Sequence, residues 1–247
     1  MTDQQRQLLR AEFDQRAQKG PSLDARHPGL MEKVYRRMQA QPQDRFLDLG
    51  CGSGWAARRL ALIAKDGLAV GVDVSDEMVR LARRLSVEIE NLMFVTGAAD
   101  EIPWQEDFFT LVFSGDSAFY WPDPAPAARE IFRVMTPGGR LFVLNTFFRD
   151  NPFWERWQSV YRLPVVLKSA AEWADVFAEA GFEAVETTQV TDETPVEADF
   201  QPNEWYASPE EKAEFRRLGA LLIEAAKPVH AASPPPGDAK PALTVLK

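Results

Sequence analysis

The sequence predicts an α/β fold in which a doubly wound, mostly parallel sheet carries helices on both faces. Short apolar runs alternate with helical patterns from residue 45 onward. A glycine-rich turn, Gly50 to Gly54, follows the first run, and the next run ends at Asp73. Strand, glycine turn and helix in this order are typical of a site for an adenosine-containing cofactor, since free amides at a helix start meet the ligand there.

Each element follows from its local pattern. Strands are expected near residues 45–49, 68–73, 92–96, 109–114 and 139–146, and helices near residues 55–65, 76–86 and 124–135. Two earlier helices, at residues 3–18 and 29–39, would form an N-terminal helical cap that comprises residues 1–42.

Beyond the fifth strand the pattern becomes less regular. A helix near 170–180 and a strand near 182–190 complete a core that spans residues 43–191. Residues 192–240 would be a helical insertion or lid, in which a helix starts at Ser208 and runs to Ala226. Residues 241–247 would carry the last strand, near 242–246, so that the 247 residues form a single domain.

The glycine turn fits two cofactor patterns. Residues 52–57 fit G-x-G-x-x-A, which is typical of dinucleotide sites and leaves an NAD(P)-dependent oxidoreductase open. Residues 48–54 fit D-x-G-x-G-x-G. Asp73 lies 19 residues after Gly54, at the tip of the second strand, where a carboxylate can accept hydrogen bonds from both ribose hydroxyls.

The second pattern resembles the first motif of class I S-adenosylmethionine-dependent methyltransferases, in particular their small-molecule, quinone-biosynthesis-like branch. The segments that carry the resemblance are residues 47–54, 71–75, 102–104, 109–114 and 136–141. The resemblance implies a seven-stranded Rossmann-like sheet whose last strand inserts antiparallel beside the fifth. It also implies S-adenosyl-L-methionine as cofactor and in-line methyl transfer to an oxygen, nitrogen or carbon of a small molecule. A non-catalytic protein that keeps the cofactor site is a further alternative.

The resemblance assigns roles to cofactor residues. The backbone around Gly50 and Gly52 would lie against the methionine part, Gly54 would let the helix pack close, and Asp73 would hold the ribose. The cofactor-binding residues it implies are Asp48, Gly50, Cys51, Gly52, Gly54, Asp73, Val74, Met78, Ala99, Asp100 and Ser114. Val74 and Met78 would flank the adenine, although both also fit plain helix packing.

The segment from Gly97 departs from the family pattern. Ala98 stands where such methyltransferases usually have an acid that contacts the adenine amino group. The Ala99 amide can still meet the ring. Asp100 either replaces the missing acid or faces solvent.

The loop after the fourth strand would line the space between cofactor and acceptor, because this sheet edge faces the ligand. Asp116 and Tyr120 are candidates for substrate positioning or proton removal, or for structural roles. Aromatic residues at 147–161, with Trp205 and Tyr206, would wall a pocket for an apolar or ring-bearing acceptor or close the core.

Composition disfavours other classes. A net charge of −9 argues against nucleic acid as a partner, and no apolar run approaches the ~20 residues of a membrane span. A single cysteine and no signal-peptide pattern fit a cytoplasmic protein. The only two histidines, His27 and His230, belong to no metal-ligand cluster, so no metal site is expected.

Overall fold

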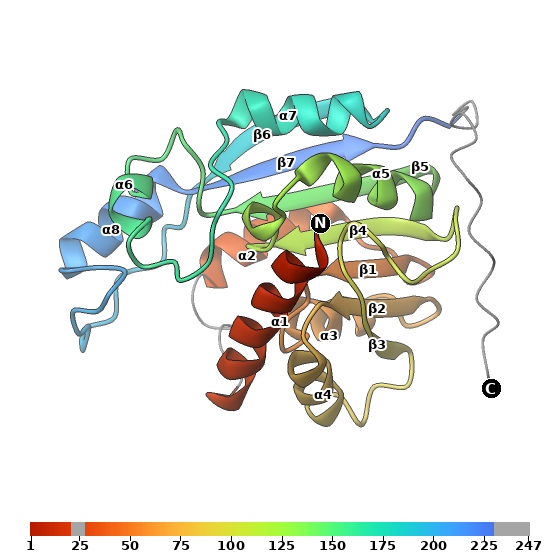
Figure 1. Ribbon diagram of the computed structural model, residues 1–247, viewed down its shortest axis with the longest axis horizontal. Helices are drawn as coiled ribbons and strands as arrows, with labels where there is room; N and C mark the ends of the chain where they lie inside the picture. Colours follow the sequence, from red (N-terminus) through yellow and green to blue (C-terminus); the bar gives the residue numbers. More distant parts are fainter. Residues whose placement is uncertain (21–27, 230–247) are drawn as a thin grey trace.

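The computed structural model describes residues 1–20 and 28–229 and contains a seven-stranded sheet flanked by helices (Figure 1). The strand order is β3-β2-β1-β4-β5-β7-β6, with β7 antiparallel to both of its neighbours and the first five strands parallel. The strands are β1 Arg45–Leu49, β2 Leu68–Asp73, β3 Leu92–Thr96, β4 Phe109–Gly115, β5 Met135–Asn145, β6 Glu183–Val190 and β7 Ala220–Ala226. The helices are α1 Asp3–Gln18, α2 Pro28–Met38, α3 Trp55–Ala61, α4 Asp76–Arg84, α5 Pro124–Val134, α6 Trp154–Trp157, α7 Ala170–Glu179 and α8 Pro209–Leu218.

Side chains of the central strands alternate between two apolar layers, which explains why the sheet is covered twice. On β1, Phe46 packs with α2 and α3, whereas Leu47 packs with α5 and α7. The same alternation separates Phe142 from Val143 on β5. Strands buried on both faces read as continuous apolar runs, and these runs made the parallel sheet predictable.

Local capping chemistry fixes where several helices start. The Ser75 hydroxyl accepts a hydrogen bond from the Met78 amide at the first turn of α4, and Asp123 caps α5 with Pro124 at its first position. Ser169 and Glu172 form a reciprocal capping box on α7. These caps stand directly before helices that the sequence predicts.

The predicted boundaries hold at the core and shift by a few residues at helix ends. Helix α3 ends at Ala61 rather than 65, and β5 begins at Met135 rather than 139. The early part of β5 pairs Met135 with Phe109, and an irregularity in the pairing follows before Leu111. The sheet and its flanking helices therefore confirm the predicted fold class.

One prediction in the C-terminal part is wrong. The helix expected over residues 208–226 ends at Leu218, and Ala220–Ala226 instead forms β7 between β5 and β6. Gly219 separates them with φ +78°, and a Cβ there would lie 2.3 Å from the Val190 carbonyl oxygen. The segment between β6 and β7 is thus residues 191–219, shorter than the expected insertion. The strand predicted at 242–246 lies outside the described residues.

Candidate active site

The glycine turn joins the end of β1 to α3 and is fixed to β2. The Gly50 and Cys51 amides donate to the Val72 carbonyl at 2.7 and 3.1 Å. Gly50, Gly52 and Gly54 have φ of +75°, +53° and +79°, which side chains rarely adopt. A Cβ on Gly50 would lie 2.4 Å from Ser117, and one on Gly54 would lie 2.5 Å from Phe94, whereas Gly52 faces open space. Gly52 is therefore the glycine of this turn whose backbone has room for a ligand.

Asp73 meets the glycine turn directly, as the sequence predicts for one shared site. Its Oδ2 accepts a hydrogen bond from the Gly52 amide at 2.8 Å, and its Oδ1 accepts one from Ser75 at 2.9 Å. Burial raises the pKa of this carboxyl to about 6, although both amides favour the ionised form. The nearest polar partners of Asp73 are backbone amides, so the carboxylate keeps acceptor capacity for further donors.

Asp48 lies one strand away and orients the same turn. Its Oδ2 accepts a hydrogen bond from the Ala57 amide at 3.0 Å, in the first turn of α3. Burial raises the pKa of this carboxyl to about 7, and the nearby Asp73 charge adds to the shift. The contact holds the helix start against the loop.

Cys51 occupies the inside of the turn. Its side chain packs against Ala57, Val79 and Phe94, with 2% of the residue exposed. Burial raises the pKa of the thiol well above its usual value, and both neighbouring carboxylates raise it further. A buried, protonated thiol of this kind is not a nucleophile.

Helix α1 crosses the edge of this site and binds the loops that carry it. The Arg10 Nε donates to the Val74 carbonyl at 3.1 Å, and the Ser75 hydroxyl donates to Asp14 at 2.5 Å. Helix α1 therefore lies against the residues that follow β2, and its role as a cap over the cofactor stays a prediction.

Asp100 takes part in this cover rather than facing water. Its carboxylate lies 3.4 Å from the Arg6 guanidinium and 2.6 Å from the Met1 amino group, with 10% of its side chain exposed. The solvent-facing alternative is therefore wrong. Ala98, the position without the usual acid, forms an isolated antiparallel bridge to Glu101, and Ala99 lies beside the large core cluster.

Met78 and Val74 lie close to this edge. Met78 packs against Ala17 and Leu81, with Phe13 beside them, between α1 and α4. This environment is the helix packing that the sequence leaves open for Met78. Val74 follows Asp73 and packs, partly buried, against the large core cluster.

The loop after β4 is fastened to the glycine turn by two serines. The Ser114 and Ser117 hydroxyls are 2.6 Å apart, and Ser117 donates to the Leu49 carbonyl at 3.1 Å. Ser117 also fills the space beside Gly50. Sequence reasoning predicted Ser114 and missed Ser117, because its partner lies 68 residues away.

Asp116 stabilises the ends of two strands. Its Oδ1 accepts hydrogen bonds from the Thr146 amide and hydroxyl at 2.7 and 2.8 Å, and its own φ is +52°. These bonds join the carboxyl ends of β4 and β5. These contacts therefore support a structural role for Asp116.

Tyr120 lies under α1. Its hydroxyl is 3.3 Å from an Arg16 nitrogen, and its ring meets Phe13 edge-on at 5.2 Å between centroids. Burial raises the pKa of the phenol above its ordinary value of 10. Tyr120 is thus neutral at physiological pH, so it can donate a hydrogen bond but does not serve as a base.

Aromatic side chains from three segments form one continuous cluster beside this loop. Phe147 and Phe119 contact Tyr161, with centroid distances of 4.8 and 5.5 Å, and Tyr161 contacts Trp205 at 5.3 Å. The Trp157 indole donates to the Trp205 carbonyl at 3.0 Å. The aromatic residues expected either to wall a pocket or to close the core thus form one packed cluster, which joins the region after β5 to residues 205–206.

One polar side chain at this sheet edge was missed by the sequence reasoning. Asn145 ends β5, is fully buried, and neither polar atom of its amide has a hydrogen-bond partner. It follows the apolar run Leu141–Leu144 as Asp73 follows its own run, and that placement is the signal that could have found it.

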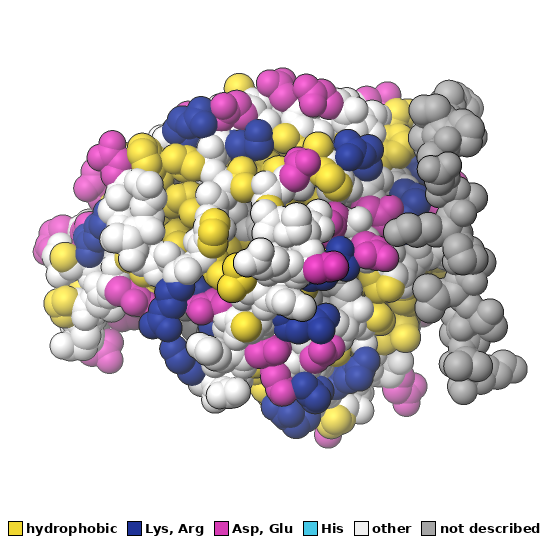
Figure 2. All heavy atoms as spheres, in the orientation of Figure 1, with side chains coloured by type: hydrophobic (Ala, Val, Ile, Leu, Met, Phe, Trp, Pro, Cys, Tyr) yellow, Lys and Arg dark blue, Asp and Glu magenta, His cyan; other side chains and the backbone are white. Residues whose placement is uncertain are grey.

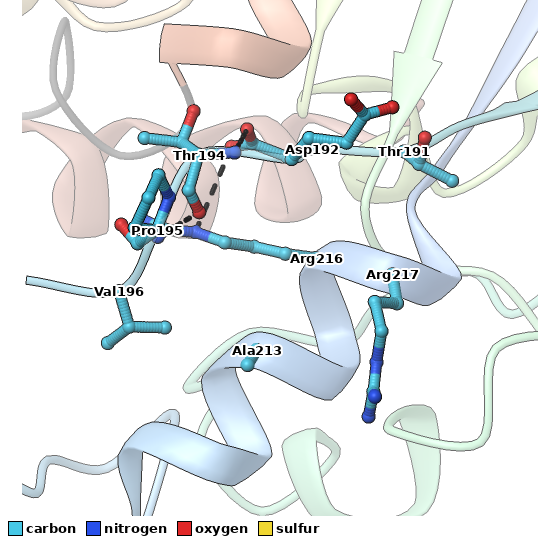
Figure 3. Close-up of a pocket in the computed structure, with 9 residues that line it drawn as sticks. Thr191, Asp192, Thr194, Pro195, Val196, Ala213, Arg216 and Arg217 are labelled. Atoms are coloured by element: carbon cyan, nitrogen blue, oxygen red, sulfur yellow. Dashed lines mark hydrogen bonds and ion pairs between the residues drawn. The ribbon is translucent and has the colours of Figure 1, made fainter.

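A separate cavity of about 430 Å³ lies between residues 191–196 and α8 (Figure 3). Arg216 is 2% exposed there and donates to the Thr194 and Pro195 carbonyls at 2.9 and 2.7 Å. Asp192, also buried, lies 3.8 Å from the Arg216 Nε. No residue of the glycine turn lines this cavity, and the arginine serves to hold the 191–196 segment onto α8.

Two further expectations concern metal and membrane. Within residues 1–20 and 28–229, no group of three or more histidine, cysteine or acidic side chains could hold a metal ion. In the same ranges, every helix is too short or too polar to cross a bilayer. His27 and His230 lie outside the described residues.

The strand order, the glycine turn after β1 and the acid at the end of β2 define a Rossmann-like methyltransferase fold. Residues 47–143 match the methyltransferase domain family. The chain is 29% identical over 124 residues to a demethylmenaquinone methyltransferase of Oceanobacillus iheyensis, covering 49% of this chain and 52% of that protein. The chain spans about half the length of the curated relatives it matches.

Solved structures share this fold. A chain in the complex of the Haloferax volcanii Trm112 methyltransferase activator with its proposed methyltransferase gives a TM-score of 0.80 at 29% identity, covering 91% of this chain and 99% of that one. YcgJ of Bacillus subtilis gives 0.62 at 21% identity, covering 82% and 99%. Residues 47–143 thus carry a methyltransferase domain of the class I S-adenosylmethionine-dependent kind, similar in sequence to that of the demethylmenaquinone methyltransferases.

Proposed function

We propose that this protein transfers the methyl group of S-adenosyl-L-methionine to a small molecule. The observation that carries the proposal is the hydrogen bond of 2.8 Å between the Gly52 amide and Asp73, next to open space at Gly52. It brings bare backbone from one strand tip and a carboxylate from the next to one point. Membership of a cofactor-using family, with residues 47–143 matching its domain, supports the same site.

The residues around that point fit an adenosyl cofactor. Asp73 would accept hydrogen bonds from the ribose hydroxyls, each worth roughly 1.5–3 kcal/mol for a charged acceptor. The backbone of Gly50, Cys51 and Gly52 would lie against the methionine part. Val74 and Ala99 would border the adenine.

Neighbouring residues would support the site without touching the cofactor. Asp48 and Gly54 set the position of α3, and Ser114 acts through Ser117 on the same turn. Met78 packs α1 onto α4, and Asp100 anchors α1 through Arg6. We propose that these contacts keep the turn rigid and covered.

Positioning rather than proton removal would drive the reaction. The bound cofactor supplies an activated methyl group and a good leaving group, so the protein must align the acceptor and exclude water. Orientation of two reactants can contribute ~7–11 kcal/mol. Asp116 is held by Thr146 and Tyr120 is neutral, so we assign both to positioning rather than to general-base catalysis.

The proposed acceptor is apolar and ring-bearing. Phe119, Phe147 and Tyr161 would present flat apolar walls beside the loop after β4. Hydrophobic side chains also gather on the surface over the segment between α6 and α7 (Figure 2). The name of the Oceanobacillus relative, a demethylmenaquinone methyltransferase, agrees with an acceptor of this kind.

Calorimetric titration with S-adenosylhomocysteine tests the cofactor site, and radiolabelled methyl transfer to a panel of quinols and phenols tests the reaction. We expect saturable binding and transfer to at least one ring-bearing acceptor. Absence of binding at millimolar ligand would remove the proposal. Binding with no transfer to any acceptor would favour the non-catalytic cofactor-binding protein.

We also propose that an activator protein of the Trm112 kind binds this chain. The observation that favours it is the Haloferax structure, which pairs such an activator with a methyltransferase that this chain resembles over 99% of its length. Elution of this chain and the purified Haloferax activator as one peak would support the pairing.

A further inference from the structure

The segment between α6 and α7, residues 158–169, is apolar although it lies at the surface. Every residue from 160 to 167 except Arg162 is apolar or aromatic, and the segment forms neither helix nor strand. Hydrophobic side chains gather on the surface over it (Figure 2). We call residues 160–167 the apolar loop. Single apolar residues at a surface are ordinary, but a group of them marks an interaction site.

The fold uses only part of the apolar loop. Four of its side chains pack inward onto the large core cluster, namely Tyr161, Leu163, Val165 and Leu167. Pro164 is exposed, and Val160 and Val166 are half-buried yet belong to none of the apolar clusters among the described residues. Core packing therefore explains the inward side chains and leaves Val160, Pro164 and Val166 without an apolar partner.

The charges of the segment are all positive. Arg162 and Lys168 are its charged residues, and neither forms an ion pair with another described residue. Two acids lie beside the segment and both are bonded, Glu172 to Arg149 at 2.8 Å and Asp150 to a backbone amide at the start of α7 at 2.7 Å. The chain as a whole carries a net charge of −9, but charges more than ~8 Å away are largely screened at physiological ionic strength. The apolar loop thus presents local positive charge on an acidic protein.

The apolar loop also lies at the same edge of the sheet as the glycine turn. It follows β5, whose carboxyl end shares an edge with those of β1, β2 and β4 because these strands are parallel. The Val166 amide donates to the Phe119 carbonyl, in the loop after β4, at 2.7 Å. The Tyr161 ring lies 4.8 Å from that of Phe147, in the aromatic cluster. Apolar surface is therefore continuous from the outside of the molecule to that cluster.

We infer that the apolar loop docks on an anionic lipid surface. Val160, Pro164 and Val166 enter the boundary of the acyl chains, and Arg162 and Lys168 meet the phosphates of the headgroups. Apolar side chains and cations on one surface are the two attractions that hold a protein at such an interface. An apolar acceptor dissolved in the lipid would then reach the aromatic cluster without crossing water. This last step rests on the proposed function, whereas docking does not.

The test is co-sedimentation of the full chain, without cofactor, with vesicles of phosphatidylglycerol and phosphatidylcholine or of phosphatidylcholine alone. We expect wild type to bind the anionic vesicles, more weakly as NaCl is raised, and to stay in the supernatant with neutral vesicles. Arg162→Glu should lower the affinity at least about fivefold, the contribution of one cation near such a surface. Val166→Asp should lower it at least about tenfold, because a charge replaces an inserted apolar side chain.

Two matched controls make the same changes at the far side of the sheet. Arg84→Glu and Val87→Asp alter exposed residues at the end of α4. α4 packs beside β3 and α7 packs beside β6, and these strands are the opposite edges of the sheet. Both controls should bind anionic vesicles like wild type. Thermal melts establish that the four variants fold, and the exposed Arg162→Glu keeps the test decisive if Val166→Asp is destabilised.

Each other outcome overturns the inference. Wild type that stays in the supernatant with anionic vesicles does not dock on lipid. Equal binding to neutral vesicles would show that Arg162 and Lys168 take no part. Loss of binding in the two controls, with Arg162→Glu and Val166→Asp unchanged, would place lipid binding on another surface. Titration with S-adenosylhomocysteine in the absence of vesicles judges the cofactor site separately, so failure of docking and failure of the proposed function are distinguishable.

Discussion

The raised pKa of Asp73 predicts that cofactor affinity depends on pH. With a pKa of about 6, about one tenth of this carboxyl is ionised at pH 5 and about nine tenths at pH 7. The ionised form accepts hydrogen bonds from ribose hydroxyls more strongly than the protonated form. Affinity for S-adenosylhomocysteine should therefore rise about tenfold between pH 5 and pH 7 and level off above that.

The assay is isothermal titration at pH 5, 6, 7 and 8 in buffers of different ionisation enthalpy. The amino and carboxyl groups of the ligand keep their charges over the rising part of this range, so the change in affinity reports on the protein. At pH 6, binding should release about half a proton, because the ligand favours the ionised carboxylate.

Two variants make this prediction specific. Asp73→Asn, which keeps the shape and cannot ionise, should bind weakly and with little pH dependence. Asp48→Asn should keep the tenfold rise, since Asp48 contacts Ala57 and lies behind the turn. A flat profile in wild type, or an unchanged slope in Asp73→Asn, would refute the assignment of Asp73 to the ribose.

Two further predictions concern the turn and the aromatic wall. Gly50→Ala places a Cβ 2.4 Å from Ser117 at φ +75°, so we expect the free energy of unfolding in urea to fall by at least ~1–2 kcal/mol. Adding Ser117→Gly should restore part of this loss, and equal stability of Gly50→Ala and wild type would contradict the prediction. Tyr120→Phe removes the hydroxyl near Arg16 and should lower stability by ~1.5–3 kcal/mol while kcat stays within a few-fold of wild type. A hundredfold fall in kcat would show that the phenol does chemistry.

The parts of the site that sequence predicts best are those set by local chemistry. The residue type alone indicates the role in three cases: the glycines that require positive φ, the small side chain of Cys51, and the acid at the tip of a strand. Gly52 and Asp73 meet in space because adjacent parallel strands bring their carboxyl ends together. Topology plus residue type was enough there.

The parts that sequence missed depend on distant partners. From the sequence Asp116 is a possible base, but in the structure Thr146, 30 residues further along the chain, donates two hydrogen bonds to it. Asp100 has no obvious partner in the sequence, whereas in the structure it pairs with Arg6 of α1. Residues 220–226 read as helix because a short apolar run buried on both faces has no strand period. Only its pairing with β5 and β6 decides the matter.

The insertion of β7 also governs the order in which the sheet can be assembled. β6 finds its described strand partner, β7, thirty residues further along the chain. A nascent chain can therefore form the first five strands, with the glycine turn and Asp73, before β7 is available to pair with β6. Shortening the chain to Leu218 would thus remove β7 and leave β6 without its strand partner. β5 would then become an exposed edge strand of the sheet.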